Sequence, residues 1–171
     1  DFLARLRPRV EALTVGDPTD DATDVGPVID TGAAERIVSW VQEAASAGAT
    51  VLTGGTREGN LVQPTLLTDI NEDMKVACME IFGPVVSLFK YSDVMDAVRA
   101  VDNSSFGLQA GLFTNDMALV YDAFDALEVG GLMVNDISAF RVDHMPYGGG
   151  KRSGFGREGL RSAIEEMTEI K

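Results

Sequence analysis

The sequence contains little cysteine, little histidine and no long apolar run, and each shortage excludes a class of protein. Cys78 is the only cysteine among 171 residues, so no disulfide can form within the chain. His144 is the only histidine, and no Cys, His or carboxylate cluster has metal-ligand spacing, so we expect no metal site. No leader peptide is recognisable, and no apolar run approaches the roughly 18 residues that cross a bilayer. These features are typical of a cytoplasmic protein.

Basic residues are also scarce relative to acidic ones. The chain has 14 Lys and Arg against 27 Asp and Glu, which gives a formal net charge of -13. Such a charge repels phosphate backbones and anionic lipid headgroups, so we expect neither nucleic acid nor a membrane as a partner. With 45% hydrophobic residues the chain is long enough to bury a core and to form a single domain. Amphipathic helical patterns run up to both ends, so we expect a fragment that is truncated at both ends.

Hydrophobic periodicity predicts helices that alternate with strands. Helices are predicted over residues 2–14, 31–47, 93–102, 116–128 and 158–168. Ser92 and Asn115 stand where the N-caps of the third and fourth helices are expected. Short apolar runs predict buried strands over residues 50–53, 62–67, 85–90, 110–114 and 131–135. Because crossovers of about ten or more residues separate the last three strands, we expect an α/β fold with a mostly parallel sheet flanked by helices.

Two glycine-rich segments are similar to phosphate-binding loops, but neither has the required context. Residues 154–159 fit the pattern G-x-G-x-x-G and begin a helix, yet no strand leads into them and no acidic residue follows at the required spacing. In residues 148–153, Arg152 interrupts the Lys-Ser pair that a P-loop needs. We interpret residues 148–153 as a loop in which glycines permit positive φ angles and close backbone approach, with basic side chains facing solvent.

Cys78 could be a nucleophile or a packed or incidental thiol. A nucleophilic cysteine needs a neighbouring base, and His144 lies far away in the sequence. The flanking residues Ala77 and Met79 are apolar, which favours the packed or incidental thiol.

Five motifs follow one another in an order that identifies a family. They are residues 80–85 (Glu-Ile-Phe-Gly-Pro-Val), 103–108, 110–114, 131–135 and 146–159. Over its whole length the chain resembles the aldehyde dehydrogenase superfamily. The resemblance implies that residues 1–171 are the C-terminal part of a catalytic domain of the aldehyde dehydrogenase type, without the dinucleotide-binding domain.

The resemblance also implies a cofactor site for NAD or NADP. In this family the glutamate of the Glu-x-Phe-Gly-Pro motif binds the ribose hydroxyls beside the nicotinamide, and the phenylalanine packs near the ribose and the ring. Those roles fall to Glu80 and Phe82. A carboxylate can accept hydrogen bonds from two vicinal hydroxyls, and a phenyl face can orient a planar cation. Periodicity alone favours a different interpretation, in which Glu80 caps a helix and Phe82 belongs to the core.

The loop ahead of the Gly-Gly-x-Lys motif implies a substrate site. In this family aromatic side chains from that loop line the aldehyde tunnel, and the candidates here are Phe140 and Tyr147. The loop also contains Arg141, which can bind a substrate carboxylate or phosphonate bidentately, and His144, which can add a donor. The sequence is thus similar to branches that act on small or anionic aldehydes such as lactaldehyde or semialdehydes. The alternative is that Arg141 pairs with Asp143 or faces water.

The family reaction oxidises an aldehyde to the carboxylic acid through a cysteine thioester. The resemblance places the nucleophile and the general base upstream of residue 1, and Cys78 does not align with the nucleophile. We therefore expect no catalytic residue in this chain, and we expect it to be inactive alone. A CoA-acylating aldehyde dehydrogenase and a non-catalytic interaction module derived from such an enzyme remain open. The parent protein is expected to be a homodimer or homotetramer, and the isolated chain is expected to leave apolar surface or a sheet edge uncovered.

Overall fold

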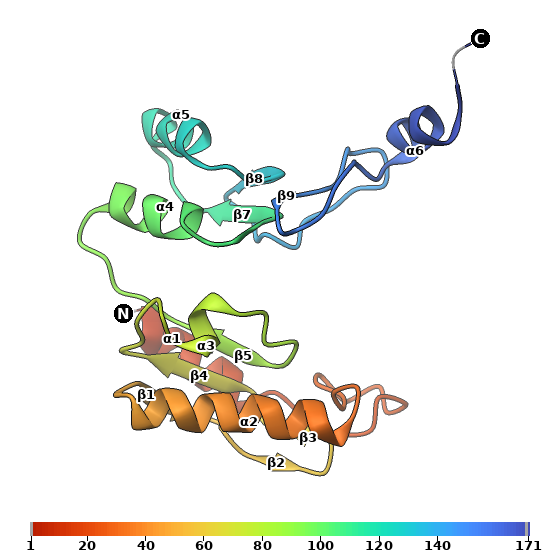
Figure 1. Cartoon of the computed structure of the whole chain (residues 1–171). Helices are drawn as coiled ribbons and strands as arrows, with labels where there is room; N and C mark the ends of the chain where they lie inside the picture. Colours follow the sequence, from red (N-terminus) through yellow and green to blue (C-terminus); the bar gives the residue numbers. More distant parts are fainter. Residues whose placement is uncertain (1, 170) are drawn as a thin grey trace. The chain divides into compact units, whose positions relative to one another are not determined.

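A computed structural model describes residues 2–169 and 171 of the chain (Figure 1). The chain divides into two compact units, residues 1–90 and 91–171. Among the described residues, no helix is long and apolar enough to cross a membrane.

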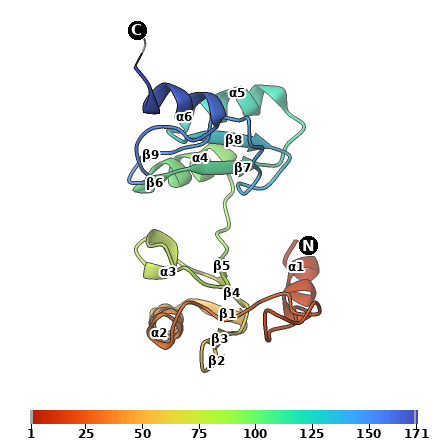
Figure 2. The same cartoon turned by 90° about the vertical axis from the view of Figure 1, so that its right-hand side faces the viewer.

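The first unit is a three-stranded sheet between helices. The sheet order is β1 (Thr50–Thr53), β4 (Thr65–Thr68) and β5 (Val85–Ser87). Strand β4 runs antiparallel to β1 and parallel to β5. Figure 2 shows α1 (Phe2–Glu11) and α2 (Thr31–Ser46) on opposite faces of this sheet. The unit is completed by a hairpin of β2 (Arg57–Glu58) and β3 (Leu61–Val62) and by the short helix α3 (Lys75–Cys78).

The core of the first unit lies between α2 and β4. All four residues of β4 are buried, as expected for a central strand that is covered on both faces. Helix α2 begins after Asp30, whose carboxylate accepts a hydrogen bond of 2.7 Å from the backbone N–H of Ala33. The helix buries one apolar stripe against the sheet at Ala34, Ile37, Val41 and Ala44.

Among the residues that the structure describes, fewer are buried in the second unit than in the first. Strands β7 (Gln109–Leu112) and β8 (Gly131–Val134) run parallel and are joined through α5 (Met117–Ala126). Strands β6 (Phe106–Gly107) and β9 (Gly150–Lys151) form an antiparallel pair. The unit also contains α4 (Val94–Asp102) and α6 (Leu160–Met167). The apolar faces of α5 and α6 are exposed, as expected: Phe124 retains 64% of its accessible surface and Leu160 retains 70%.

The α/β class predicted from the sequence is confirmed, and both strand pairs that are joined through a helix run parallel. The three antiparallel pairs were not foreseen, because two of them consist of strands only two residues long. The predicted N-caps are wrong by one residue. Asp93 and Asp116 cap α4 and α5, because their carboxylates accept hydrogen bonds of 2.7 and 2.9 Å from backbone N–H groups of the first turn. Ser92 and Asn115 precede these caps.

Candidate functional site

The turn formed by residues 79–84 connects α3 to β5 in the first unit and is fixed from several sides. Ile81 is half-buried and packs against both apolar clusters of the core. The guanidinium of Arg36, on α2, donates a hydrogen bond of 3.0 Å to the carbonyl of Ile81. Pro84 accepts a bond of 2.8 Å from the N–H of Thr65, on β4. The backbone of the turn is therefore held by both α2 and the central strand.

Gly83 lets this turn approach α2 closely. A Cβ atom at Gly83 would lie 2.5 Å from Cδ1 of Ile37, a residue with no exposed surface. Ordinary carbon contacts are about 3.5–4.0 Å, so a larger residue would displace the turn or the core.

Phe82 stands in a conformation that is unfavourable for a phenylalanine and points out of the unit. Its φ angle is +49°, in the left-handed region that non-glycine residues rarely adopt, and the residue is 75% exposed. Because neighbouring Ile81 turns into the core, Phe82 is left on the outside. Residues held in such strained backbone conformations cluster at active sites and ligand clamps. The interpretation of Phe82 as a core residue is wrong.

Glu80 is exposed as well. Its carboxylate makes no hydrogen bond or ion pair with any residue that the structure describes. Helix α3 begins after Met74 and has no side-chain cap, so Glu80 does not cap it. The carboxylate is thus available to accept hydrogen bonds from a ligand.

Cys78, at the end of α3, is exposed, so of the two predicted alternatives the packed thiol is wrong and the incidental thiol stays a prediction. Its Sγ lies 3.7 Å from the carbonyl oxygen of Asp73.

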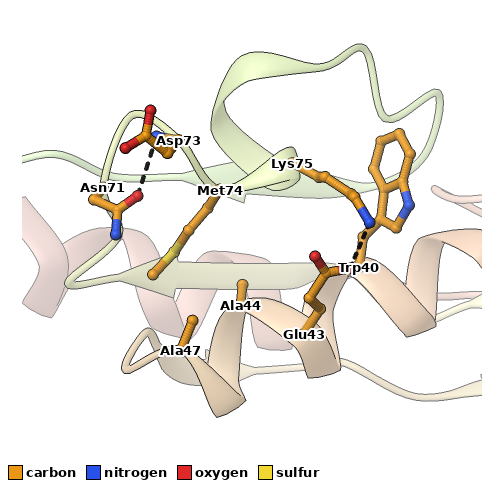
Figure 3. A pocket seen from close by; sticks show the side chains of 8 residues that line it. All are labelled: Trp40, Glu43, Ala44, Ala47, Asn71, Asp73, Met74 and Lys75. Atoms are coloured by element: carbon orange, nitrogen blue, oxygen red, sulfur yellow. Dashed lines mark hydrogen bonds and ion pairs between the residues drawn. The ribbon is translucent and has the colours of Figure 1, made fainter.

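A pocket in the first unit lies between α2 and residues 71–75, and Figure 3 shows its lining residues. Lys75 forms an ion pair of 2.8 Å with Glu43 there, and Trp40 stands beside it. None of the residues predicted to bind cofactor or substrate lines this pocket.

The predicted substrate residues all belong to the second unit, in the loop between β8 and β9. Arg141 and Tyr147 are in contact, with the guanidinium carbon 4.3 Å from the centre of the tyrosine ring. Phe140 is 43% exposed, and its carbonyl accepts a hydrogen bond of 3.3 Å from Nε2 of Gln109. His144 is exposed in the same loop. The structure therefore brings two of the four residues into direct contact.

The charged partner of Arg141 is Glu158 and not Asp143. Nη2 of Arg141 lies 2.9 Å from Oε2 of Glu158. Tyr147 and Glu158 also exchange two backbone hydrogen bonds, of 3.0 and 2.6 Å. Glu158 could not be predicted from the sequence, because 17 positions separate it from Arg141 and no periodic pattern links the two segments.

In residues 148–153 the expected positive φ angle falls on Lys151 (+53°) and on none of the glycines. The expected close backbone approach is present, since a Cβ atom at Gly148 would lie 2.6 Å from the carbonyl oxygen of Gly156. Of the two basic residues in this segment, Arg152 is exposed as expected, whereas the side chain of Lys151 is held by an acidic partner. Nζ of Lys151 forms an ion pair of 2.9 Å with Asp102, and the lysine side chain is only 20% exposed. The N–H of Glu128 and the ammonium group of Lys151 bond to the Asp102 carboxylate, and together they lower the pKa of Asp102.

Comparison with known proteins places the chain in a family. A model of the aldehyde dehydrogenase family matches residues 1–171. The 3-sulfolactaldehyde dehydrogenase of Priestia megaterium is 51% identical over 168 residues, which are 98% of this chain and 35% of that protein. The chain belongs to the aldehyde dehydrogenase family, which confirms the resemblance seen in its motifs. It spans about 35% of the length of such curated relatives.

Solved structures agree with this assignment. Aldehyde dehydrogenase 21 from Physcomitrella patens, in complex with the reaction product succinate, superposes with a TM-score of 0.94 at 42% identity, covering 99% of this chain and 36% of that one. Glyceraldehyde-3-phosphate dehydrogenase from Methanocaldococcus jannaschii, complexed with NADP, gives a TM-score of 0.94 at 37% identity, covering 99% of this chain and 37% of that one.

Proposed function

We propose that the complete protein containing this chain is an NAD(P)-dependent aldehyde dehydrogenase that oxidises small, anionic aldehydes to carboxylic acids. The observation that carries the cofactor part is the outward-pointing Phe82, held at a left-handed φ angle by a turn anchored to Arg36 and Thr65. In this proposal Glu80 accepts hydrogen bonds from the ribose hydroxyls, and Phe82 provides an apolar wall for the nicotinamide.

The substrate part of the proposal rests on Arg141. Its guanidinium is stacked on Tyr147, which leaves part of its planar fork of N–H donors for a substrate carboxylate, sulfonate or phosphate. Phe140 and Tyr147 supply aromatic surface beside the aldehyde chain, and His144 supplies a further donor. The names of three similar proteins support an anionic substrate: one acts on 3-sulfolactaldehyde, one was solved with succinate, and one acts on glyceraldehyde-3-phosphate.

The chemistry divides between this chain and the rest of the protein. A cysteine thiolate from the rest of the protein would add to the aldehyde carbonyl, bound NAD(P) would supply the hydride acceptor, and water would release the acid from the resulting thioester. We propose that this thiol and the general base lie outside residues 1–171, so that the chain alone does not turn over aldehyde. The chain contributes binding and orientation only. We further propose that the complete protein is a cytoplasmic homodimer or homotetramer.

The test compares the complete enzyme with residues 1–171. Reduced cofactor is followed by absorbance, with NAD or NADP, and with 3-sulfolactaldehyde against uncharged lactaldehyde. We expect turnover by the complete enzyme only, with kcat/KM higher for the anionic aldehyde. Turnover by residues 1–171 would contradict the division of chemistry. A product that forms only when CoA is present would favour the CoA-acylating alternative, and an inactive complete protein would favour the interaction module.

A further inference from the structure

The backbone fixes the relative positions of Tyr147 and Glu158, and Arg141 contacts both of their side chains. Tyr147 and Glu158 face each other as an isolated antiparallel bridge that exchanges both backbone hydrogen bonds. In a bridge of this kind the two side chains project from the same face. The phenol ring and the carboxylate are thus presented side by side, and Arg141 reaches both.

Glycines on either side of the bridge make this approach possible. A Cβ atom at Gly148 would lie 2.6 Å from the carbonyl oxygen of Gly156, and one at Gly159 would lie 2.9 Å from the carbonyl oxygen of Met145. Gly159 also has a φ angle of +113°, which excludes an ordinary side chain. The position of Glu158 opposite Tyr147 is therefore set by the chain's conformation.

Two contacts fix the guanidinium in different ways. The Tyr147 ring, 4.3 Å away, restrains the plane of the guanidinium by stacking. The carboxylate of Glu158, at 2.9 Å, restrains rotation within that plane by occupying a donor on Nη2. Among the described residues, Glu158 is the hydrogen-bond partner of this guanidinium. The remaining donors consequently point in a fixed direction.

We propose that Glu158 is a positioning residue that orients Arg141 for the anionic group of the substrate and thereby sets the preference for anionic over neutral aldehydes. The inference rests on the proposed function of Arg141 and assigns the residue that makes this arginine effective. A flexible arginine loses rotamer freedom when it binds an anion, and a residue that orders it beforehand removes that loss from the binding step. The negative charge of Glu158 offsets the positive charge of Arg141. Glu158 therefore also limits how tightly an anion is held.

The test uses the complete enzyme and the ratio of kcat/KM for 3-sulfolactaldehyde to that for lactaldehyde. Glu158→Ala should lower this ratio by roughly threefold to tenfold, mainly through KM for the anionic aldehyde, since the ordering of one long side chain has about that weight. Glu158→Gln keeps an acceptor for Arg141 and removes the repelling charge, so its ratio should equal or exceed that of the parent enzyme. The double variant Arg141→Ala/Glu158→Ala should have the ratio of Arg141→Ala alone, because the two residues act as one unit.

Glu165→Ala is the matched control. It breaks the exposed Arg161–Glu165 ion pair of 2.8 Å on α6 and should leave the ratio unchanged. Equal loss on both aldehydes in Glu158→Ala, or additive losses in the double variant, would overturn the proposal. If Arg141→Ala lowers the ratio while Glu158→Ala does not, only this inference fails. An unchanged ratio in Arg141→Ala would instead refute the proposed anionic site itself.

Discussion

Replacing Gly83 with alanine tests whether the turn that presents Phe82 is held by close packing against α2. The added Cβ would lie 2.5 Å from Cδ1 of Ile37, about 1 Å or more inside ordinary carbon contact. Ile37 has no exposed surface and belongs to a cluster with Ala34 and Val62, so it has little room to move. Overpacking of this kind costs about 1–3 kcal/mol. We therefore expect Gly83→Ala to lower the free energy of unfolding by that amount.

A second substitution makes this prediction specific. Ile37→Val removes the clashing Cδ1 atom and by itself costs about 0.5–1.5 kcal/mol. The double variant should be destabilised by about 1 kcal/mol less than the sum of the two single losses, because the valine makes room for the new methyl group. Simple additivity of the two losses would show that the 2.5 Å contact does not govern stability.

Urea unfolding of the chain, followed by fluorescence, provides the measurement. Trp40 is the only tryptophan and packs against the core of the first unit, so its emission reports that unit. Gly32→Ala is the control: its nearest contact is Asp30 Oδ1 at 3.4 Å, and alanine is the better helix former, so no loss of stability is expected. A Gly83→Ala variant as stable as the parent chain would refute the reasoning.

Two further predictions concern the second unit. Asp116→Ala should lower the free energy of unfolding by about 1 kcal/mol because the α5 cap is lost, whereas Asn115→Ala should have a much smaller effect. Equal losses for the two variants in denaturant unfolding would contradict the cap assignment. The pKa of Asp102 is lowered in the folded state, so its charge stabilises the fold above its unfolded pKa and this contribution disappears as the pH falls through the folded pKa. Asp102→Asn should accordingly lower the free energy of unfolding near neutral pH and converge with the parent chain in acid, as followed by circular dichroism; a constant difference across the pH range would contradict this.

Features that depend on local sequence were predictable. The apolar period of α2 identifies Ile37 and Ala44, both of which are buried. The run at residues 50–53 is strand β1. The caps were placed one residue early because Ser92 and Asn115 are also good capping residues, and only the backbone conformation decides between adjacent candidates.

Features that depend on contacts between distant segments were not predictable. Arg141 has an acidic residue two positions away, yet its partner is Glu158, because glycine-dependent backbone approach brings that residue opposite Tyr147. Lys151 was expected in solvent, and it pairs with Asp102 because β9 is aligned with β6. The exposure of Phe82 depends likewise on Gly83 packing against Ile37, which no periodic pattern records.

The affinity of the complete enzyme for NAD(P), measured by calorimetry on Phe82→Ala and Glu80→Gln variants, tests the central claim most directly. Both side chains are proposed to touch the cofactor, so each substitution should raise Kd by about tenfold, the factor that corresponds to about 1.4 kcal/mol. Phe2→Ala is the control, since Phe2 is also an exposed phenylalanine, 68% accessible, on α1. Unchanged cofactor affinity in both variants would contradict the assignment of Glu80 and Phe82 as a cofactor wall.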